Sequence, residues 1–471
     1  MTDDVIGHLE REHDAILERL KAVLRLPSVS TDPAYADGMR AARQHFMDRL
    51  KAIGLEDVQL LDGGGHPAVY GSWEHAPGAP TVIIYGHYDV QPPEPLELWK
   101  SPPFEPTIRD GRLYARGASD VKGSTTIAVE TVGAFLAVRG RCPVNVKVFI
   151  EGEEEVGSPS LSRIVERHRD LLQADALISA DGGRGSTVVP TLNTGSRGIA
   201  WLEMTIRTAA KDMHSGRYGG ALRNALHEMA SLIASLHDAE GRIAVADYMT
   251  GIPALTERQR TDAAALAIDE DAFYAELEGV PRGDSRYSVV ERLTLLPTID
   301  VNGMWGGYTG PGGKTVLPCT ATAKVTMRLV PGQCPQKALE AVRRHLQAHC
   351  PQGARLTFSP SGGGSPATSL EAGHPLLVAA ESVIERTTGR RPVHTRLGGT
   401  VPIMAIFKEM LGLDALVFGF AKPDEDVHAP NEFFHLSSIP EGLQSWTLLL
   451  VELAKFKPEQ FRTTPREVAL T

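Results

Sequence analysis

The sequence predicts an α/β protein in which a doubly wound, mostly parallel sheet is interrupted by a smaller, inserted α+β domain. Two observations predict this fold class. Early in the chain and again near its end, short apolar runs alternate with helical periodicity, as in parallel strands covered by helices on both faces. In the middle, runs that alternate apolar and polar residues indicate strands with one exposed face. At 471 residues, the chain is also longer than one core usually holds.

The elements of the larger domain are expected in alternating order. Short apolar runs predict strands at residues 81–85, 144–150, 176–179 and 415–420. Helical periodicity predicts helices at 8–25, 39–53, 124–138, 160–172, 375–388 and 441–455. Each strand is followed or preceded by a helix, which is the pattern of βαβ units.

The inserted domain is expected to be a small open-faced sandwich. Strand alternation covers residues 199–208, 320–330 and 354–359, and helical runs cover 224–236 and 336–349. The stretch "SGGGSP" at 361–366 is interpreted as a hinge. The predicted boundaries are therefore 1–197 and 362–471 for the two parts of the larger domain, and 198–361 for the insertion.

Charge and composition exclude several classes of partner. The net charge of −10 argues against nucleic acid or an anionic membrane surface as the main partner. The charged start "MTDDVIGHLEREHD" lacks the apolar core of a signal peptide, and we expect no apolar run long enough to cross a bilayer. The four cysteines have no CxxC spacing, which predicts free thiols in a reducing compartment. A cytoplasmic protein without a membrane span is expected.

Acids and histidines follow almost every predicted strand of the larger domain. Because ligands in open α/β sheets bind at the carboxyl ends of the strands, these side chains are expected at one edge of the sheet. A separate loop before a helix adds one more aspartate. The residues are His87, Asp89, Asp120, Asp181 and His428, and the run Glu151, Glu153, Glu154 and Glu155.

Each of these residues has an ordinary interpretation when taken alone. Asp120 has the position of a helix N-cap, Asp181 that of a turn residue, and the glutamate run that of a solvated loop. Their convergence on one edge is more informative. Mixed imidazole and carboxylate donors suit Zn²⁺, with Mn²⁺ or Co²⁺ as alternatives. Two metal ions about 3.5–4 Å apart would offset the concentrated negative charge.

Several motifs resemble one enzyme family. The stretches "YGHYDVQPP", "LYARGASDVKGS", "EGEEEVGS", "KDMHSG", "KTVLP", "MRLVPGQ" and "GGTVPI" occur in one order along the chain. They resemble the di-zinc dipeptidase and carboxypeptidase family, which includes carnosinases, glutamate carboxypeptidases, desuccinylases and aminoacylases. The resemblance covers roughly residues 20–455 and is strongest to the carnosinase-like dipeptidase branch. It implies that the larger domain is catalytic and that the inserted domain is a lid that also forms a homodimer.

The resemblance implies two zinc ions per subunit. His87 and Asp181 would hold one ion, Glu155 and His428 the other, and Asp120 would bridge them. It also implies a non-proline cis peptide after the bridging aspartate, between Asp120 and Val121.

The resemblance also implies two catalytic carboxylates. Asp89 would orient the imidazole of His87. Glu154 would be the general base that takes a proton from water and delivers it to the leaving amine. Glu151 and Glu153 inherit no metal role and are interpreted as structural or solvent-facing.

The family's substrate contacts fall in and beside the inserted domain. His214 resembles a histidine that one subunit's lid extends into the partner's active site to stabilise the oxyanion. Arg328 resembles the guanidinium that binds the substrate carboxylate. Thr315 and Thr400 match substrate-contacting hydroxyls.

The sequence leaves more than one function open. The leading hypothesis is a metal-dependent hydrolase of dipeptides or short peptides with a free C-terminal carboxylate. Dipeptidases of this branch usually carry a glutamate where this chain has Leu397, near the substrate's amino end. An amidohydrolase of N-acyl or N-carbamoyl amino acids is therefore the alternative. An inactive relative with a binding role is a third hypothesis, but it should have lost a ligand or the base, and this chain keeps them.

Overall fold

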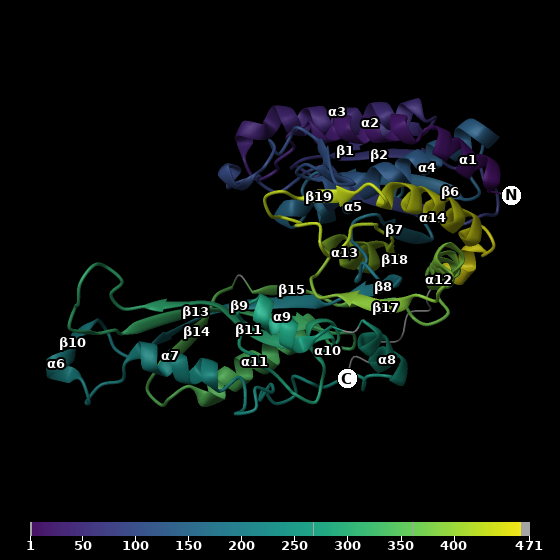
Figure 1. Cartoon of the computed structure of the whole chain (residues 1–471). Coiled ribbons are helices and arrows are strands. Elements are labelled where there is room, and N and C mark those ends of the chain that lie inside the picture. Colours follow the sequence, from purple (N-terminus) through teal and green to yellow (C-terminus); the bar gives the residue numbers. More distant parts are fainter. Residues whose placement is uncertain (1, 267, 361, 463–471) are drawn as a thin grey trace. The chain divides into compact units, whose positions relative to one another are not determined.

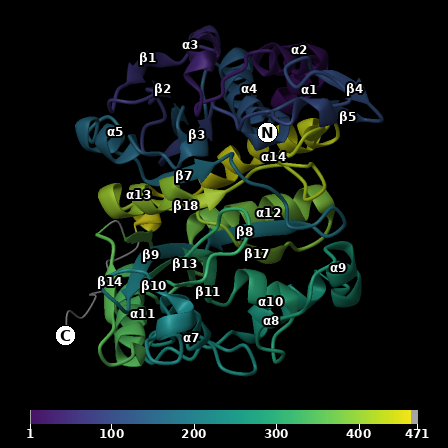
Figure 2. The same ribbon diagram turned by 90° about the vertical axis from the view of Figure 1, so that its left-hand side faces the viewer.

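The computed structural model describes residues 2–266, 268–360 and 362–462, and within it the chain divides into two compact units. The larger unit comprises Met1–Gly195, Leu370–Thr395 and Val401–Thr471. The smaller unit comprises Ser196–Ser369 and the short return Arg396–Thr400. Figures 1 and 2 show the elements of both units.

The larger unit is built on a mixed sheet, which confirms the α/β class. Its central strands β6, β3, β7 and β18 are parallel, as expected, whereas β1–β2 and β2–β6 pair antiparallel. The order across the sheet is β1 (Glu56–Leu61), β2 (Ala68–Trp73), β6 (Asn145–Glu151), β3 (Thr81–His87), β7 (Ala176–Ser179), β18 (Asp414–Val417) and β8 (Thr191–Ser196), and β17 (Val393–Leu397) also pairs with β8.

Helices cover both faces of this sheet (Figure 1). One face carries α1 (Asp3–Arg11), α2 (His13–Leu24), α3 (Ala36–Ala52), α4 (Gly123–Arg139), α12 (Pro375–Thr388) and α14 (Ser438–Leu453). The other face carries α5 (Leu161–Arg167) and α13 (Pro402–Leu411), where Phe407 packs edge-on against Phe149 of β6. Both faces of the sheet are therefore buried, which explains why the central strands are continuous apolar runs in the sequence.

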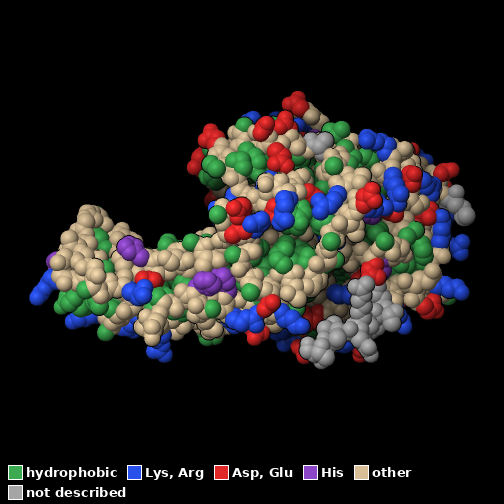
Figure 3. Space-filling model, turned by 90° about the horizontal axis from the view of Figure 1, so that it is seen from below, with side chains coloured by type: hydrophobic (Ala, Val, Ile, Leu, Met, Phe, Trp, Pro, Cys, Tyr) green, Lys and Arg blue, Asp and Glu red, His purple; other side chains and the backbone are tan. Residues whose placement is uncertain are grey.

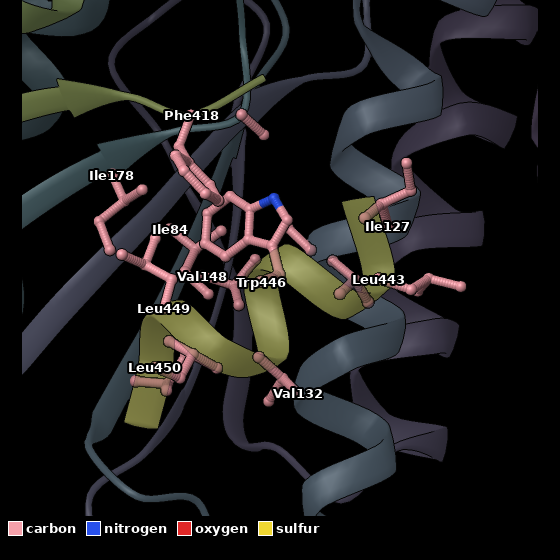
Figure 4. Close-up of a cluster of buried hydrophobic side chains, with 14 of the residues drawn as sticks. Ile84, Ile127, Val132, Val148, Ile178, Phe418, Leu443, Trp446, Leu449 and Leu450 are labelled. Atoms are coloured by element: carbon pink, nitrogen blue, oxygen red, sulfur yellow. The ribbon is translucent and has the colours of Figure 1, made fainter. Parts of the chain in front are cut away.

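The core of the larger unit centres on Trp446 of α14 (Figure 4). Its side chain is fully buried, and its ring lies edge-on to Phe418 with centroids 5.6 Å apart. Inward-facing residues of three adjacent strands, Ile84, Val148 and Ile178, line the same cluster. This packing holds the strands in the register that aligns their carboxyl ends.

The expected N-terminal helix at 8–25 is in fact two helices. The helical path breaks at Glu12, where φ is −87° and ψ is 2°, so α1 ends at Arg11 and α2 begins at His13. The first helix also starts five residues earlier than predicted, because Asp3 and Asp4 favour the first turn of a helix.

One helical stretch meets the length and composition of a membrane span, contrary to the sequence-based expectation. Ala118–Arg139 reaches a mean hydropathy of 1.2 over an 18-residue window. However, 83% of that window is buried inside the protein, as in the core helix of a folded domain. The hydropathy of this stretch thus reflects burial on all sides by protein.

The smaller unit is an open-faced sandwich. Its sheet runs β11 (Thr298–Gly306), β13 (Thr320–Leu329), β9 (Gly198–Arg207) and β14 (Arg355–Phe358), with all pairs antiparallel. Alternate residues of β9 and β13 are buried against α7 (Ala225–Ala234) and α11 (Pro335–His349). Smaller elements are β10 (Met213–His214), α6 (Ser215–Tyr218), α8 (Glu257–Ala265), α9 (Glu270–Glu276), α10 (Val289–Thr294) and β12 (Val316–Leu317).

The stretch interpreted as a hinge is partly a strand. Gly363–Ser365 forms β15, which pairs antiparallel with β9 at Ile199, Ala200 and Trp201. Ser361, the expected end of the insertion, lies outside the described residues. The smaller unit instead continues to Ser369, because β15 extends its sheet.

All four cysteines have free thiols, as their spacing predicted. On the face shown in Figure 3, acidic and basic side chains are interspersed.

The remaining strands are β4 (Thr107–Arg109), β5 (Arg112–Tyr114), β16 (Thr368–Ser369) and β19 (Phe433–His435), of which β19, β5 and β4 form a separate sheet.

Candidate metal centre

The carboxyl ends of the parallel strands bring the predicted side chains of the larger unit to one edge of the sheet. β3 ends at His87, which lies opposite Glu151 at the end of β6. On the other side of β3, β7 ends two residues before Asp181. Parallel register therefore aligns three chain segments that are distant in sequence.

The five predicted ligands form two groups that share Asp120. The donor atoms of His87, Asp120 and Asp181 lie within 4.8 Å of one another, and so do those of Asp120, Glu155 and His428. Oδ1 of Asp120 is 3.1 Å from Nε2 of His87, whereas its Oδ2 is 3.0 Å from Nε2 of His428. Nε2 of His428 is also 3.2 Å from Oε2 of Glu155. One carboxylate thus faces two donor groups, an arrangement that suits a pair of cations.

The segment that carries Asp120 has an irregular backbone. The chain enters it at Gly117 with φ of +81°, a conformation that glycine adopts readily, and the helix α4 begins only at Gly123. The peptide between Asp120 and Val121 is cis, which confirms the expectation from the family resemblance.

Asp89 is fully buried and contacts both His87 and the turn that carries Glu154 and Glu155. Its Oδ1 is 3.5 Å from Nδ1 of His87, and its own backbone carbonyl is closer, at 3.0 Å. Its two carboxylate oxygens accept hydrogen bonds from the backbone amides of Glu154 and Glu155, at 3.3 and 3.1 Å. Asp89 therefore fixes the imidazole and the glutamate turn together.

The electrostatics of the site are those of crowded carboxylates. Burial and then the negative charge of Asp181 raise the pKa of Glu154 to about 9. Burial and then Asp120 raise the pKa of Asp181 to about 7. At neutral pH, Glu154 would therefore hold a proton and Asp181 would be partly protonated, unless positive charge entered the site.

The pKa values of the two histidines are also raised, but in their case the neighbouring carboxylates favour the charged form. Hydrogen bonds to Asp120 and then to Glu155 raise the pKa of His428 to about 10. Burial opposes the charged form of His87, but its hydrogen bonds to Asp120 and Asp89 outweigh this effect and hold its pKa well above the usual range. The protons that these rings keep are those that a bound metal ion displaces.

The glutamate run divides by role. Glu151 is buried and accepts hydrogen bonds from the hydroxyls of Tyr85, at 2.5 Å, and Ser158, at 3.1 Å. Glu153 is also buried and accepts the backbone amides of His66 and Ser160. The structure thus shows both to be structural, and the solvent-facing alternative is wrong for both.

Sequence reasoning missed Gln91 as a component of this site. Its backbone amide and its side-chain Nε2 donate to the two carboxylate oxygens of Glu155, at 3.1 and 2.8 Å. The only available signal was its place four residues after His87 in "GHYDVQ".

The predicted substrate residues lie in the smaller unit and form two pairs. Nη1 of Arg328, on β13, donates to Oγ1 of Thr400 at 3.3 Å, and that hydroxyl donates to the carbonyl of Arg197 at 2.7 Å. His214 and Thr315 lie on adjacent segments, because β10 pairs with β12 and the amide of Ser215 bonds to the carbonyl of Thr315. The imidazole of His214 is exposed.

The fold of the larger unit, together with the two ligand groups that share Asp120, is that of a metallopeptidase. Residues 83–452 match the family model "Peptidase family M20/M25/M40", and the chain belongs to this family. The resemblance that the motifs indicated is thereby confirmed.

Several curated and solved relatives are similar over nearly their whole length. The chain is 28% identical to a "Beta-Ala-His dipeptidase" of Rattus norvegicus, covering 97% of this chain and 96% of the relative. It is 26% identical to a "Cys-Gly metallodipeptidase DUG1" of Candida albicans, covering 93% and 94%. Among solved structures, the metallo-carboxypeptidase Sso-CP2 of Sulfolobus solfataricus is 29% identical with a TM-score of 0.79, covering 94% of this chain and 99% of that one.

Proposed function

We propose that this protein is a di-metal hydrolase that cleaves the amide bond of dipeptides or short peptides with a free C-terminal carboxylate. The observation that carries the proposal is Asp120, whose two carboxylate oxygens each approach a different histidine, with Glu154 in the adjoining turn. The printed names of the relatives, dipeptidases and a carboxypeptidase, support the same reaction class.

The proposed cofactors are two Zn²⁺ ions per subunit, with Mn²⁺ or Co²⁺ as alternatives. The donor set fits, because each group combines one imidazole nitrogen with carboxylate oxygens, the mixture found in catalytic zinc sites. His87 and Asp181 would hold one ion, Glu155 and His428 the other, and Asp120 both. When bound, such ions supply Lewis acidity at the scissile carbonyl and lower the pKa of the attacking water.

Glu154 is proposed to move the protons of the reaction. Its carboxylate would accept a proton from the attacking water and deliver it to the nitrogen of the leaving amine. Asp89 supports this role, because it holds the backbone amide of Glu154 and contacts His87 at the same time. The base is thus fixed relative to the metal ligands by one buried carboxylate.

The smaller unit is proposed to bind the substrate and to form a homodimer. The guanidinium of Arg328 would bind the substrate's terminal carboxylate, with the hydroxyl of Thr400 beside it. Thr315 would contribute a second hydroxyl, and His214 would reach the partner subunit's site. In this proposal the smaller unit is the lid, the larger unit is the catalytic domain, and the enzyme is cytoplasmic.

Asp120→Asn is expected to remove both metal ions, because the neutral amide has only one oxygen and cannot bridge two cations. Metal analysis after dialysis against zinc should give about two ions per wild-type subunit and fewer than one in the variant. Asp181→Asn should lose only one ion, since it belongs to one group. Asp62→Asn, with an exposed side chain, is the control and should keep both. Two ions retained in Asp120→Asn would contradict the shared ligand.

A second candidate function follows from Leu397. Its side chain is half-buried three residues before Thr400, in the same unit, and its carbonyl accepts the amide of Arg197 at 2.9 Å. An apolar side chain here supplies no negative charge for a substrate ammonium. Hydrolysis of N-acyl or N-carbamoyl amino acids is therefore the alternative function.

A substrate panel tests the proposal directly. Dipeptides with free amino termini, the same peptides N-acetylated, and N-acyl and N-carbamoyl amino acids would be offered to the enzyme loaded with zinc or with manganese. The proposal expects the free dipeptides to be hydrolysed, and Leu397→Glu to raise the preference for them by about 10–100-fold through a charge-assisted hydrogen bond. Leu397→Gln, similar in shape but neutral, should not. Hydrolysis of N-acyl amino acids alone would favour the second candidate instead.

A further inference from the structure

The loop that carries His428 is joined to the segment that carries Asp120 by a continuous set of hydrogen bonds. β19 pairs antiparallel with β5, with Phe433 opposite Tyr114. The pairing continues one step further, where the amide of Ala115 donates to the carbonyl of Glu432 at 3.1 Å. Beyond that point the backbones diverge, and side chains take over the connection.

The carboxylate of Glu432 binds the backbone of the Asp120 segment. Its Oε1 accepts the amides of Ser119, at 2.9 Å, and Asp120, at 3.1 Å. Its Oε2 accepts the amide of Gly117 at 3.1 Å and Nη1 of Arg116 at 2.6 Å. Both Glu432 and Arg116 are buried, with 0% and 1% of their surface exposed.

A second buried glutamate repeats this arrangement at the other end of the loop. Glu425 accepts the hydroxyl of Ser119 and, with its other oxygen, the backbone amide of His435 at 3.0 Å. His428 therefore lies on a loop with a buried carboxylate three residues before it and another four residues after it. Both carboxylates bond to the segment 116–120.

The loop between the two glutamates needs this support. Asp426, His428 and Asn431 all have positive φ, between 51° and 67°, a conformation that non-glycine residues adopt rarely. Such backbone persists only where surrounding contacts over-determine it. Asn431 adds one such contact, because its side chain bonds to the backbone of Leu98 and Lys100.

We infer that Glu432 is a positioning residue of the metal centre, which holds the bridging Asp120 and the ligand His428 in register with each other. This inference rests on the proposed function. An ordinary buried ion pair with Arg116 would not require Glu432 to accept three backbone amides of the ligand-bearing segment. Buried partners that orient the ligands of a metal commonly change metal affinity when they are replaced.

The test is zinc affinity in Glu432→Gln, measured by competition with a chelating dye well below the unfolding temperature. The amide nitrogen of glutamine donates instead of accepting, so one side of the bridge is lost. Affinity for zinc should fall by about 10–100-fold, at both sites because Asp120 belongs to both groups. Glu432→Asp keeps the charge opposite Arg116 and should fold more readily, yet its shorter side chain should also weaken zinc binding.

The matched control is Glu130→Gln. Glu130 is a carboxylate of the same unit, 4% exposed and bonded to Arg19 and Arg49, and it is no part of the metal cluster. Both glutamine variants should unfold at lower temperature, but only Glu432→Gln should lose zinc affinity and show a smaller zinc-induced rise in Tm.

Wild-type zinc affinity in both Glu432 variants would overturn the inference and leave the proposed function intact. Wild-type protein that binds zinc but hydrolyses nothing would overturn the proposed function and leave this positioning role supported. Wild-type protein that binds no zinc would overturn both.

Discussion

Glu154→Gln is expected to lower kcat by about 10²–10⁴-fold while both metal ions remain bound, the range for losing a general base. The substitution is nearly isosteric and removes only the proton acceptor. Glu154 belongs to neither ligand group, and Asp89 holds its backbone amide, which glutamine keeps. Steady-state kinetics together with metal analysis of the same sample would measure both parts of the expectation.

The physical basis of this expectation is the charge around Glu154. Burial and the neighbouring carboxylates raise its pKa to about 9, so it would hold a proton at pH 7 while the site carries no cations. Positive charge at the five ligands would lower the pKa of Glu154 towards the value that suits a general base. The base and the ligands are therefore expected to depend on each other.

Glu153→Gln is the matched control, since it removes the same charge from the neighbouring position. Glu153 accepts two backbone amides and does not contact either ligand group, so its loss should lower stability with little change in kcat of the folded enzyme. An equal loss of kcat in both variants would show that the turn, rather than the proton transfer, is responsible.

The central strands of the larger unit could be predicted because burial on both faces leaves a direct trace in the sequence. The strand predicted at residues 176–179 is β7. The strand predicted at 81–85 is β3, which continues to His87. The helix break at Glu12 could not be predicted, because the apolar periodicity continues through it. Nor could β15, since three residues of "GGGS" form a strand only by pairing with β9.

The candidate site was predictable in part for a similar reason. Parallel strands place their carboxyl ends together, so the residues that follow them converge whatever the length of the intervening chain. The division of roles between Glu154 and Glu155 came from the family resemblance, since adjacent glutamates have no distinguishing local signal. The structure separates them, because only Glu155 lies within reach of His428.

The residues that support the site gave no local signal. Glu432 contacts Asp120 across 312 positions and does so through backbone amides, which exist at every residue and leave no pattern in side-chain type. Gln91 likewise acts on the carboxylate of Glu155 from a loop 64 positions away. Such contacts depend on the folded path of two loops, and periodicity carries no information about that path.

His214→Ala is expected to lower kcat by roughly 10²–10³-fold with normal metal content, the effect of losing one oxyanion donor. Nδ1 of His214 accepts the amide of Gly216 at 3.1 Å, so the neutral ring carries its proton on Nε2. The exposed ring thus presents a donor away from its own backbone. Kinetics and metal analysis of His214→Ala would check this, with His227→Ala as a control on an exposed helix position of the same unit.

Subunit exchange between the two inactive variants would then show which chain supplies the histidine. In a dimer of one Glu154→Gln and one His214→Ala subunit, one site would combine an intact Glu154 with an intact histidine from its partner. That site should work, whereas the other would lack both groups. Random mixing should therefore restore about a quarter of the wild-type rate from two nearly inactive parents, since half of the dimers would be mixed and each would have one working site. If mixed dimers form and no activity returns, His214 acts within its own chain or has no part in the reaction.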